Sequence, residues 1–252
     1  MKITIIGAGN IGGATAMGLK APYELTVTAR TRKTLEKFEG SGIRTTLDNI
    51  EAVKDADIII FAVKPWIMEE VVRSVAPSID FPSQLIVSMA PGVKSGDILS
   101  WLPEGAKLAY AIPNTAIEFG ESMTFIAPVT TSGEETALLK EVFDKAGETI
   151  IVSEKMLIPG TSLASCGIAY ALRYIHAAAQ GGVELGFFAD DAVRIVSQTV
   201  RGASEILRSR GSHPEAEIDR VTTPGGMTIK GLNAMEDAGF TPAVIKGLKA
   251  NR

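Results

Sequence analysis

The chain has 252 residues, 46% of them hydrophobic and 21% charged, with a formal net charge of −4. This composition indicates a soluble globular protein of one large or two modest domains, and the mild negative charge argues against nucleic-acid or anionic-membrane partners. One cysteine and two histidines exclude an internal disulfide and argue against a metal site. Met1 leads directly into the first expected strand, and no apolar stretch approaches the roughly 20 residues that span a bilayer. We therefore expect a cytoplasmic protein without a targeting peptide.

The first residues predict a strand, a tight turn and a helix. The apolar run at residues 3–6 leads into Gly7-x-Gly9-x-x-Gly12, and helix-forming residues follow at 14–19. In this pattern Gly7 adopts unusual turn angles, Gly9 lets the main chain approach a pyrophosphate, and Gly12 lets the helix pack on the strand. The helix N-terminus favours a phosphate group. The stretch therefore predicts dinucleotide binding, and a purely structural turn is the alternative.

The end of the second expected strand, residues 25–29, bears on the choice of cofactor. NAD-preferring folds usually place Asp or Glu there, about 20 residues after the glycines, to hold the ribose 2′-hydroxyl. This chain has Arg30 and Thr31 instead, whose charge and hydroxyl can hold a 2′-phosphate. The alternative is the exposed start of a helix, although basic residues there oppose the helix dipole. We predict NADP(H) as the cofactor, with NAD(H) as the alternative.

Strands and helices alternate to about residue 152. The strongest buried strands are expected at residues 58–63 and 85–89. Other strands are expected at 42–45, 108–112, 124–127 and 148–152, and helices at 47–54, 67–75 and 134–146. Lys64-Pro65 follows a buried strand, where parallel sheets place ligand-binding loops, although Lys64 can equally be an ordinary surface lysine. The alternation predicts an α/β fold, a Rossmann-type doubly wound sheet over residues 1–152.

From Ser153 onward the pattern is helical. Ala, Gly and Leu recur at helical spacing over residues 158–186 and again over 190–208. About 100 residues give this part a thin core, and its many small residues indicate helices that pack closely against partners. Residues 153–252 are therefore predicted to form an all-α domain that dimerises.

A second glycine turn lies near the end of the chain. Pro224-Gly225-Gly226 forces a bend between Thr223 and Thr228, and a helix is expected at residues 229–236. In one interpretation Thr228 caps that helix and the glycines only bend the chain. In the other, main-chain N–H groups and hydroxyls form a nest that receives a carboxylate.

Four motifs in order resemble those of the pyrroline-5-carboxylate reductase family. They are Gly-Ala-Gly-Asn-Ile-Gly at 7–12, Ala-Val-Lys-Pro at 62–65, Ile-Pro-Asn-Thr at 112–115 and Val-Thr-Thr-Pro-Gly-Gly-Met-Thr-Ile-Lys-Gly-Leu at 221–232. The resemblance covers nearly the whole chain, and the Thr-Thr-Pro-Gly-Gly-x-Thr block is its most specific part. It implies the last step of proline biosynthesis, in which hydride passes from NAD(P)H to the imine carbon of 1-pyrroline-5-carboxylate to give L-proline.

The resemblance also assigns site residues and an assembly. The residues it places at the cofactor are Ile6, Gly7, Gly9, Asn10, Ile11, Gly12, Arg30, Thr31, Asn49, Ala62, Val63, Lys64, Pro65, Pro113 and Asn114. Those it places at the imino-acid substrate are Thr223, Gly225, Gly226 and Thr228. Thr228 is expected to be the catalytic residue, as a hydrogen-bond donor to the imine nitrogen or a relay from water. The family implies a homodimer through the helical domain, and its dimers often assemble further.

The sequence departs from the family near the expected imine pocket. Ile168 replaces a proline and Cys166 a serine, while Ala116 and Met227 replace the usual proline and a smaller residue. These changes leave open a reductase of another cyclic imine, or a non-catalytic nucleotide-binding paralogue. Cys166 is interpreted as a small buried hydrophobe rather than a nucleophile, since no His/Asn partner pattern accompanies it.

Overall fold

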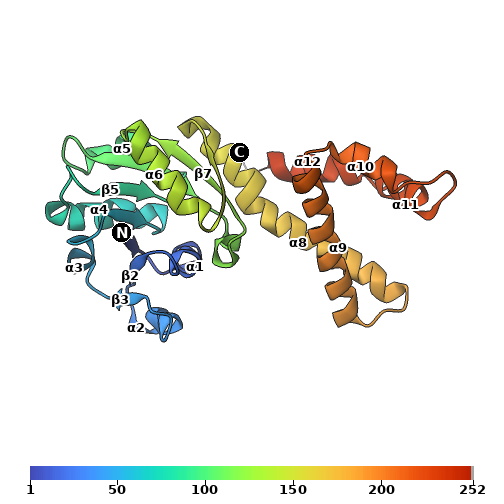
Figure 1. Ribbon diagram of the computed structural model, residues 1–252, viewed down its shortest axis with the longest axis horizontal. Helices are drawn as coiled ribbons and strands as arrows, with labels where there is room; N and C mark the ends of the chain where they lie inside the picture. The colour runs from blue at the N-terminus through green and yellow to red at the C-terminus, as the bar shows by residue number, and fades with distance from the viewer. Residues whose placement is uncertain (251–252) are drawn as a thin grey trace. The chain divides into compact units, whose positions relative to one another are not determined.

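The computed structural model describes residues 1–250 and divides into two compact units (Figure 1). The first, Met1–Ser165, contains an eight-stranded sheet of order β3-β2-β1-β4-β5-β6-β7-β8. The strands are β1 Lys2–Ile6, β2 Glu24–Thr28, β3 Arg44–Thr46, β4 Ile58–Phe61, β5 Leu85–Ser88, β6 Lys107–Ile112, β7 Ser122–Pro128 and β8 Gly147–Ile151. Neighbouring strands pair in parallel, except that β6 and β7 are antiparallel.

Seven α-helices belong to this unit within the described residues. They are α1 Asn10–Leu19, α2 Arg32–Leu35, α3 Asn49–Val53, α4 Met68–Val75, α5 Ser95–Ser100, α6 Gly133–Asp144 and α7 Leu157–Gly160. Short 3-10 helices occur at Glu36–Phe38, Pro65–Ile67, Ala76–Ser78, Thr115–Phe119 and Glu154–Met156, and a π-helical turn at Thr161–Ser165. These elements connect strands whose carboxyl ends reach the loops that carry the predicted site.

The central strands β1, β4, β5 and β6 are buried on both faces, which explains their continuous apolar runs. In β4, Ile58 and Ile60 join the core cluster that α1 and α6 cover, while Ile59 and Phe61 join the cluster that α4 and α5 cover. This alternation follows from the two-residue period of a strand. The doubly wound Rossmann-type sheet predicted from the sequence is confirmed. The predicted strands lie close to the observed ones. Helix α5 and the antiparallel pairing of β6 with β7 were not predicted from the sequence.

The second unit, from Cys166, consists of helices joined by turns, with no strand among its described residues. Its helices are α8 Cys166–Glu184, α9 Ala189–Arg210, α10 Pro214–Arg220, α11 Met227–Asp237 and α12 Phe240–Lys249. Helices α8 and α9 pack closely at Gly182, where an added Cβ would lie 3.1 Å from the Cβ of Ala192. Between residues 166 and 250 only Ala179 and Ala192 are buried hydrophobic residues. In the described part of the chain, none of the helices combines the length and the apolar character that crossing a membrane requires.

Candidate functional site

The glycine-rich loop has the geometry that its sequence predicts. Gly7 has φ +110°, and its N–H and that of Ala8 donate to the carbonyl oxygen of Thr28 at 3.2 and 2.9 Å. Helix α1 then begins at Asn10. Its N-cap, Gly9, makes no side-chain hydrogen bond, and its first turn contains no acidic residue. The first N–H groups of a helix have no partner within it, so this end of α1 offers donors and partial positive charge.

Gly12 is where α1 meets the sheet. A Cβ on Gly12 would lie 2.0 Å from the carbonyl oxygen of Gly7 and 2.8 Å from the Cβ of Ala62. A Cβ on Gly9 would meet no atom within 4 Å, and Gly9 is exposed. The two glycines therefore have different physical roles, since Gly12 is required for packing and Gly9 leaves open space beside the helix end.

This difference predicts opposite stabilities for two alanine variants. Gly12→Ala is expected to lower the free energy of unfolding by about 1–3 kcal/mol, because the new methyl group overlaps main-chain atoms. Gly9→Ala serves as the matched control, because its φ of −69° suits alanine and its Cβ position is open. Chemical denaturation without ligand measures both. Equal stabilities would contradict the packing role of Gly12.

A hollow of about 570 Å³ lies beside the glycine loop. It brings together residues from the ends of β1, β2 and β4 and from the start of α3. Those predicted at the cofactor that line it are Ile6, Gly7, Gly9, Arg30, Thr31, Asn49, Ala62, Val63 and Lys64. The predicted cofactor residues Asn10, Ile11, Gly12, Pro65, Pro113 and Asn114 are not among its lining residues.

Arg30 and Thr31 occupy the end of the hollow that follows β2. Both are exposed, and α2 begins only at Arg32, so Arg30 lies before the helix rather than in its first turn. The hydroxyl of Thr31 shares a hydrogen bond of 2.9 Å with that of Thr34, which also lines the hollow. The lining of the hollow therefore includes one arginine and two threonines, residue types suited to an anion.

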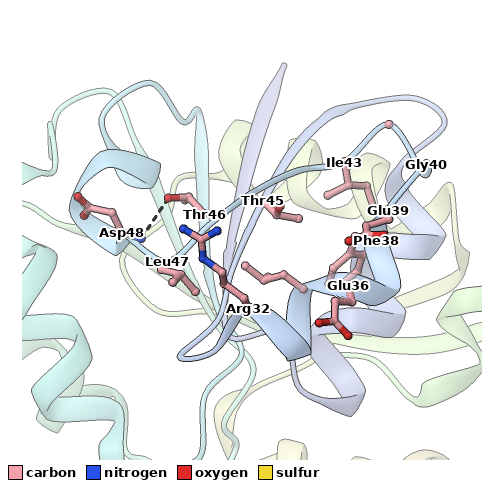
Figure 2. A pocket seen from close by; sticks show the side chains of 12 residues that line it. Arg32, Glu36, Phe38, Glu39, Gly40, Ile43, Thr45, Thr46, Leu47 and Asp48 are labelled. Atoms are coloured by element: carbon pink, nitrogen blue, oxygen red, sulfur yellow. Dashed lines mark hydrogen bonds between the residues drawn. The ribbon is translucent and has the colours of Figure 1, made fainter.

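A second hollow, of about 760 Å³, lies between α2 with the 3-10 helix that follows it and the loop between β3 and α3 (Figure 2). Leu47 lines both hollows. Asp48 has a structural role as the N-cap of α3. Its carboxylate accepts from the N–H groups of Ile50 and Glu51 at 2.8 and 3.1 Å, and its own N–H donates to Thr46 Oγ1. This capping fixes the start of α3 and hence the position of Asn49.

The strand ends beyond β4 and β6 carry the remaining cofactor candidates. Lys64 is exposed and begins the 3-10 helix Pro65–Ile67. Pro113 and Asn114 are buried, and the Asn114 side chain accepts from the N–H of Ala116 at 3.0 Å and donates to the carbonyl of Ala164 at 3.4 Å. Asn114 therefore joins the end of β6 to the π-helical turn, a structural role that the sequence did not reveal.

The phenol of Tyr110 is buried under the loop that follows β5. It donates to the carbonyl oxygen of Val93 at 2.5 Å. Burial, together with the charges of Glu154 and Asp97, raises the pKa of Tyr110 well above its ordinary value. The phenol therefore stays protonated and anchors the turn rather than acting as a base.

In the second unit, the threonine–glycine turn leads into α11. Gly225 has φ +70°, and the N–H of Gly226 donates to the carbonyl of Thr223 at 2.9 Å. Gly226 is the N-cap of α11, which begins at Met227, so the alternative in which Thr228 caps the helix is wrong. Thr228 lies inside the first turn because the helix starts two residues earlier than expected. Thr228 is exposed, as are Thr223 and Gly225.

Glu217 on α10 stabilises the segment that precedes this turn. Its carboxylate accepts from Ser212 Oγ at 2.5 Å and from the guanidinium groups of Arg210 and Arg220 at 2.6 and 2.8 Å. The hydrogen bond from Ser212 and the two arginines hold the pKa of Glu217 below its ordinary value. Thr222 is also committed, since its hydroxyl donates to the carbonyl of Ile218 at 2.7 Å. At the start of α8, Cys166 is half-buried, so it is more accessible than the buried position predicted from the sequence.

Two family models match parts of the chain. Residues 154–252 match the model described as pyrroline-5-carboxylate reductase dimerisation, and residues 2–92 match NADP oxidoreductase coenzyme F420-dependent. The structure also resembles the crystal structure of Plasmodium falciparum pyrroline carboxylate reductase with NADP bound. The two share a TM-score of 0.89 and 24% identity, over 100% of this chain and 95% of the other.

Relatives extend the match to nearly the full sequence. Pyrroline-5-carboxylate reductase 1 of Dictyostelium discoideum is 39% identical over 98% of this chain, which spans about half, 48%, of that protein's length. Pyrroline-5-carboxylate reductase 2 of the same organism is also 39% identical, over 98% of this chain and 89% of the relative. The glycine loop, the two strand ends and the threonine–glycine turn all fall within these matches. The chain therefore belongs to the pyrroline-5-carboxylate reductase family.

Proposed function

We propose that the chain reduces 1-pyrroline-5-carboxylate to L-proline with hydride from NAD(P)H. The observation that carries this proposal is the hollow at the glycine loop, which gathers anion-binding and apolar groups from three strand ends. Its place at the carboxyl ends of parallel strands is where doubly wound folds bind dinucleotides. The relatives named as pyrroline-5-carboxylate reductases support the choice of substrate.

The residues present fit NADP(H). The open space at Gly9 admits a pyrophosphate, the start of α1 offers N–H donors, and Arg30 provides a cation at the far end of the hollow. The Plasmodium falciparum protein, whose structure holds NADP, supports the same cofactor here. The proposed contacts are Ile6 to Gly12 for the pyrophosphate, Arg30 and Thr31 for the 2′-phosphate, Asn49 for the adenosine, and Ala62 to Pro65 with Pro113 and Asn114 for the nicotinamide.

Arg30 is expected to set the preference for NADPH over NADH. Arg30→Ala should raise the KM for NADPH about ten- to a hundredfold, because a charge-assisted hydrogen bond to the 2′-phosphate is lost, and should leave the KM for NADH unchanged. Steady-state kinetics with both cofactors measures the split. Lys20→Ala, at the opposite end of α1 from the glycine loop, is the matched control. Parallel changes in both KM values would contradict the assignment.

The threonine–glycine turn is the proposed substrate clamp. Thr223, Gly225 and Gly226 would hold the carboxylate through hydroxyl and main-chain donors at the start of α11. NADPH, when bound, supplies the hydride. Negative charge moves to the imine nitrogen as hydride reaches the carbon, so that nitrogen needs a donor. Thr228 is proposed for that role, as a hydrogen-bond donor or relay from water, because a threonine hydroxyl does not ionise near neutral pH.

The direct test follows oxidation of NADPH and NADH at 340 nm in the presence of 1-pyrroline-5-carboxylate. Turnover with formation of proline supports the proposal. Because Cys166, Ile168, Ala116 and Met227 depart from the family, a panel of other cyclic imino acids belongs in the same assay. Faster turnover of another imine would replace the substrate, and cofactor binding without turnover on any member would overturn the enzymatic function.

We further propose a homodimer formed through the helical part of the chain, as the match to a dimerisation family suggests. A higher oligomer, as the family's dimers often form, is an extension of the same proposal. The domain boundary at residues 152/153 stays a prediction, as does the cytoplasmic location. Size-exclusion chromatography with light scattering measures the oligomer directly.

A further inference from the structure

The ammonium group of Lys37 contacts the glycine-rich loop, although Lys37 is not one of the residues that line the hollow beside that loop. Lys37 lies on the 3-10 helix Glu36–Phe38, and its Nζ is 2.8 Å from the carbonyl oxygen of Ala8 and 3.4 Å from that of Gly9. An ammonium group has three donors and no acceptor, so it can serve both carbonyls at once. Neither the glycine pattern nor the family motifs in the sequence pointed to this residue.

The two carbonyls identify which peptide groups Lys37 acts on. The carbonyl of Ala8 shares its peptide unit with the N–H of Gly9, and the carbonyl of Gly9 shares its unit with the N–H of Asn10. In a planar trans peptide the C=O and N–H point in opposite directions. The Lys37 ammonium group at the two carbonyl oxygens therefore fixes the orientation of these N–H groups. It also polarises both peptide units, which makes the N–H groups stronger donors to an anion on the opposite side.

A neighbouring glycine makes room for the ammonium group. A Cβ on Gly13 would lie 2.4 Å from Lys37 Nζ and 3.1 Å from its Cε, while the next nearest atom, in Phe38, is at an ordinary 3.7 Å. Gly13 lies within α1, is buried, and has no left-handed φ that would require glycine. The space that Gly13 leaves is therefore occupied by the end of the Lys37 side chain.

We propose that Lys37 is a positioning residue that holds the peptide units 8–9 and 9–10 with their N–H groups directed at the cofactor's pyrophosphate, and that Gly13 is needed to seat it. This inference rests on the proposed use of NAD(P)H. It adds a cation beside the N-terminus of α1, which has no acidic residue in its first turn and no side-chain cap. Lys37 acts through the main chain and takes no part in hydride transfer.

The first test compares Lys37→Met, which keeps the length of the side chain, with Lys37→Arg and with Lys20→Met as a charge-matched control. Isothermal titration with NADPH should give a Kd about tenfold higher for Lys37→Met, with at least partial rescue in Lys37→Arg and no change in Lys20→Met. At saturating NADPH, kcat should stay at the wild-type value. A Kd for Lys37→Met equal to that of Lys20→Met would overturn the inference.

The second test uses Gly13→Ala, which displaces the ammonium group without removing it. Alanine favours a helix over glycine, so the Tm without ligand should not fall, while the Kd for NADPH should rise. In the Lys37→Met background the same change should have no further effect on Kd, which a double-mutant cycle measures. Independent effects of the two variants would overturn the shared role. If the wild-type protein binds NADPH but does not turn over, the proposed reaction is contradicted and the Kd values of the variants still test the role of Lys37. If the wild-type protein does not bind NADPH, both the proposed reaction and the role of Lys37 are overturned.

Discussion

Replacing Thr228 with alanine is expected to lower kcat about a hundred- to ten-thousandfold while the Kd for NADPH stays close to the wild-type value. The structure places Thr228 in the first turn of α11, exposed, two residues after the N-cap Gly226. Because Gly226 caps the helix, the Thr228 hydroxyl is not needed for capping and is available to a ligand. Its loss should therefore affect the developing charge on the imine nitrogen, not the folding of the helix.

The controls for this prediction come from the same turn. Thr228→Ser keeps the hydroxyl and should retain most of the activity. Thr222→Ala removes a hydroxyl that donates to the carbonyl of Ile218, so it should lower stability by about 1 kcal/mol without an equal loss of kcat. Rapid-kinetic measurement of the hydride step, with NADPH affinity measured separately, distinguishes these effects. An unchanged kcat in Thr228→Ala would refute the donor role.

The sequence predicted the sheet well because its central strands are buried on both faces and begin or end at strong turn signals. Residues 58–61 could hardly be anything but a central strand, and Gly7 and Gly12 mark the turn and the close packing that follow β1. The antiparallel pairing of β6 with β7 was not predictable, because both parallel and antiparallel strands give apolar runs here. Helix α5 was missed because six residues give too little periodicity.

The candidate site was predictable only where a motif fixes the local backbone. The glycine loop and Arg30 were found in this way. Lys37 was not, since its contact with Ala8 depends on how the segment after β2 folds back onto the loop, a tertiary event with no local pattern. The N-cap of α11, Gly226, was not predicted either, because threonine and glycine are both acceptable N-caps and the sequence left capping by Thr228 as one of two alternatives.

The described part of the helical unit buries very few hydrophobic side chains. Between residues 166 and 250 the buried hydrophobic residues are two alanines, while large apolar side chains on α8 and α9 are open to solvent. Leu172 is 59% exposed, Val193 48% and Ile195 44%. Single exposed apolar residues are ordinary, but a whole unit without a large buried hydrophobic side chain supports the proposed homodimer, in which a second copy of the chain would cover these residues.

Introducing a charge among the exposed apolar side chains of α8 and α9 is therefore expected to dissociate the proposed homodimer. Leu172→Glu should destabilise the dimer by more than about 3 kcal/mol, because the carboxylate would be buried without a partner, and should reduce helicity and reductase activity together. Leu138→Glu makes the same change at an exposed leucine of α6 in the first unit and should leave the oligomer intact. Light scattering and circular dichroism measure both variants.

Concentration provides an independent measurement on the unaltered protein. If the helices fold only as a dimer, the midpoint of unfolding rises with protein concentration, and a hundredfold increase corresponds to about 2.7 kcal/mol of added stability. The first unit, with its own two core clusters, should show no such dependence when its unfolding is followed separately. A stable monomer with the full helical content at low micromolar concentration would contradict the dimer, because the exposed leucine and isoleucine side chains of α8 and α9 would then need no partner to hold the helices together.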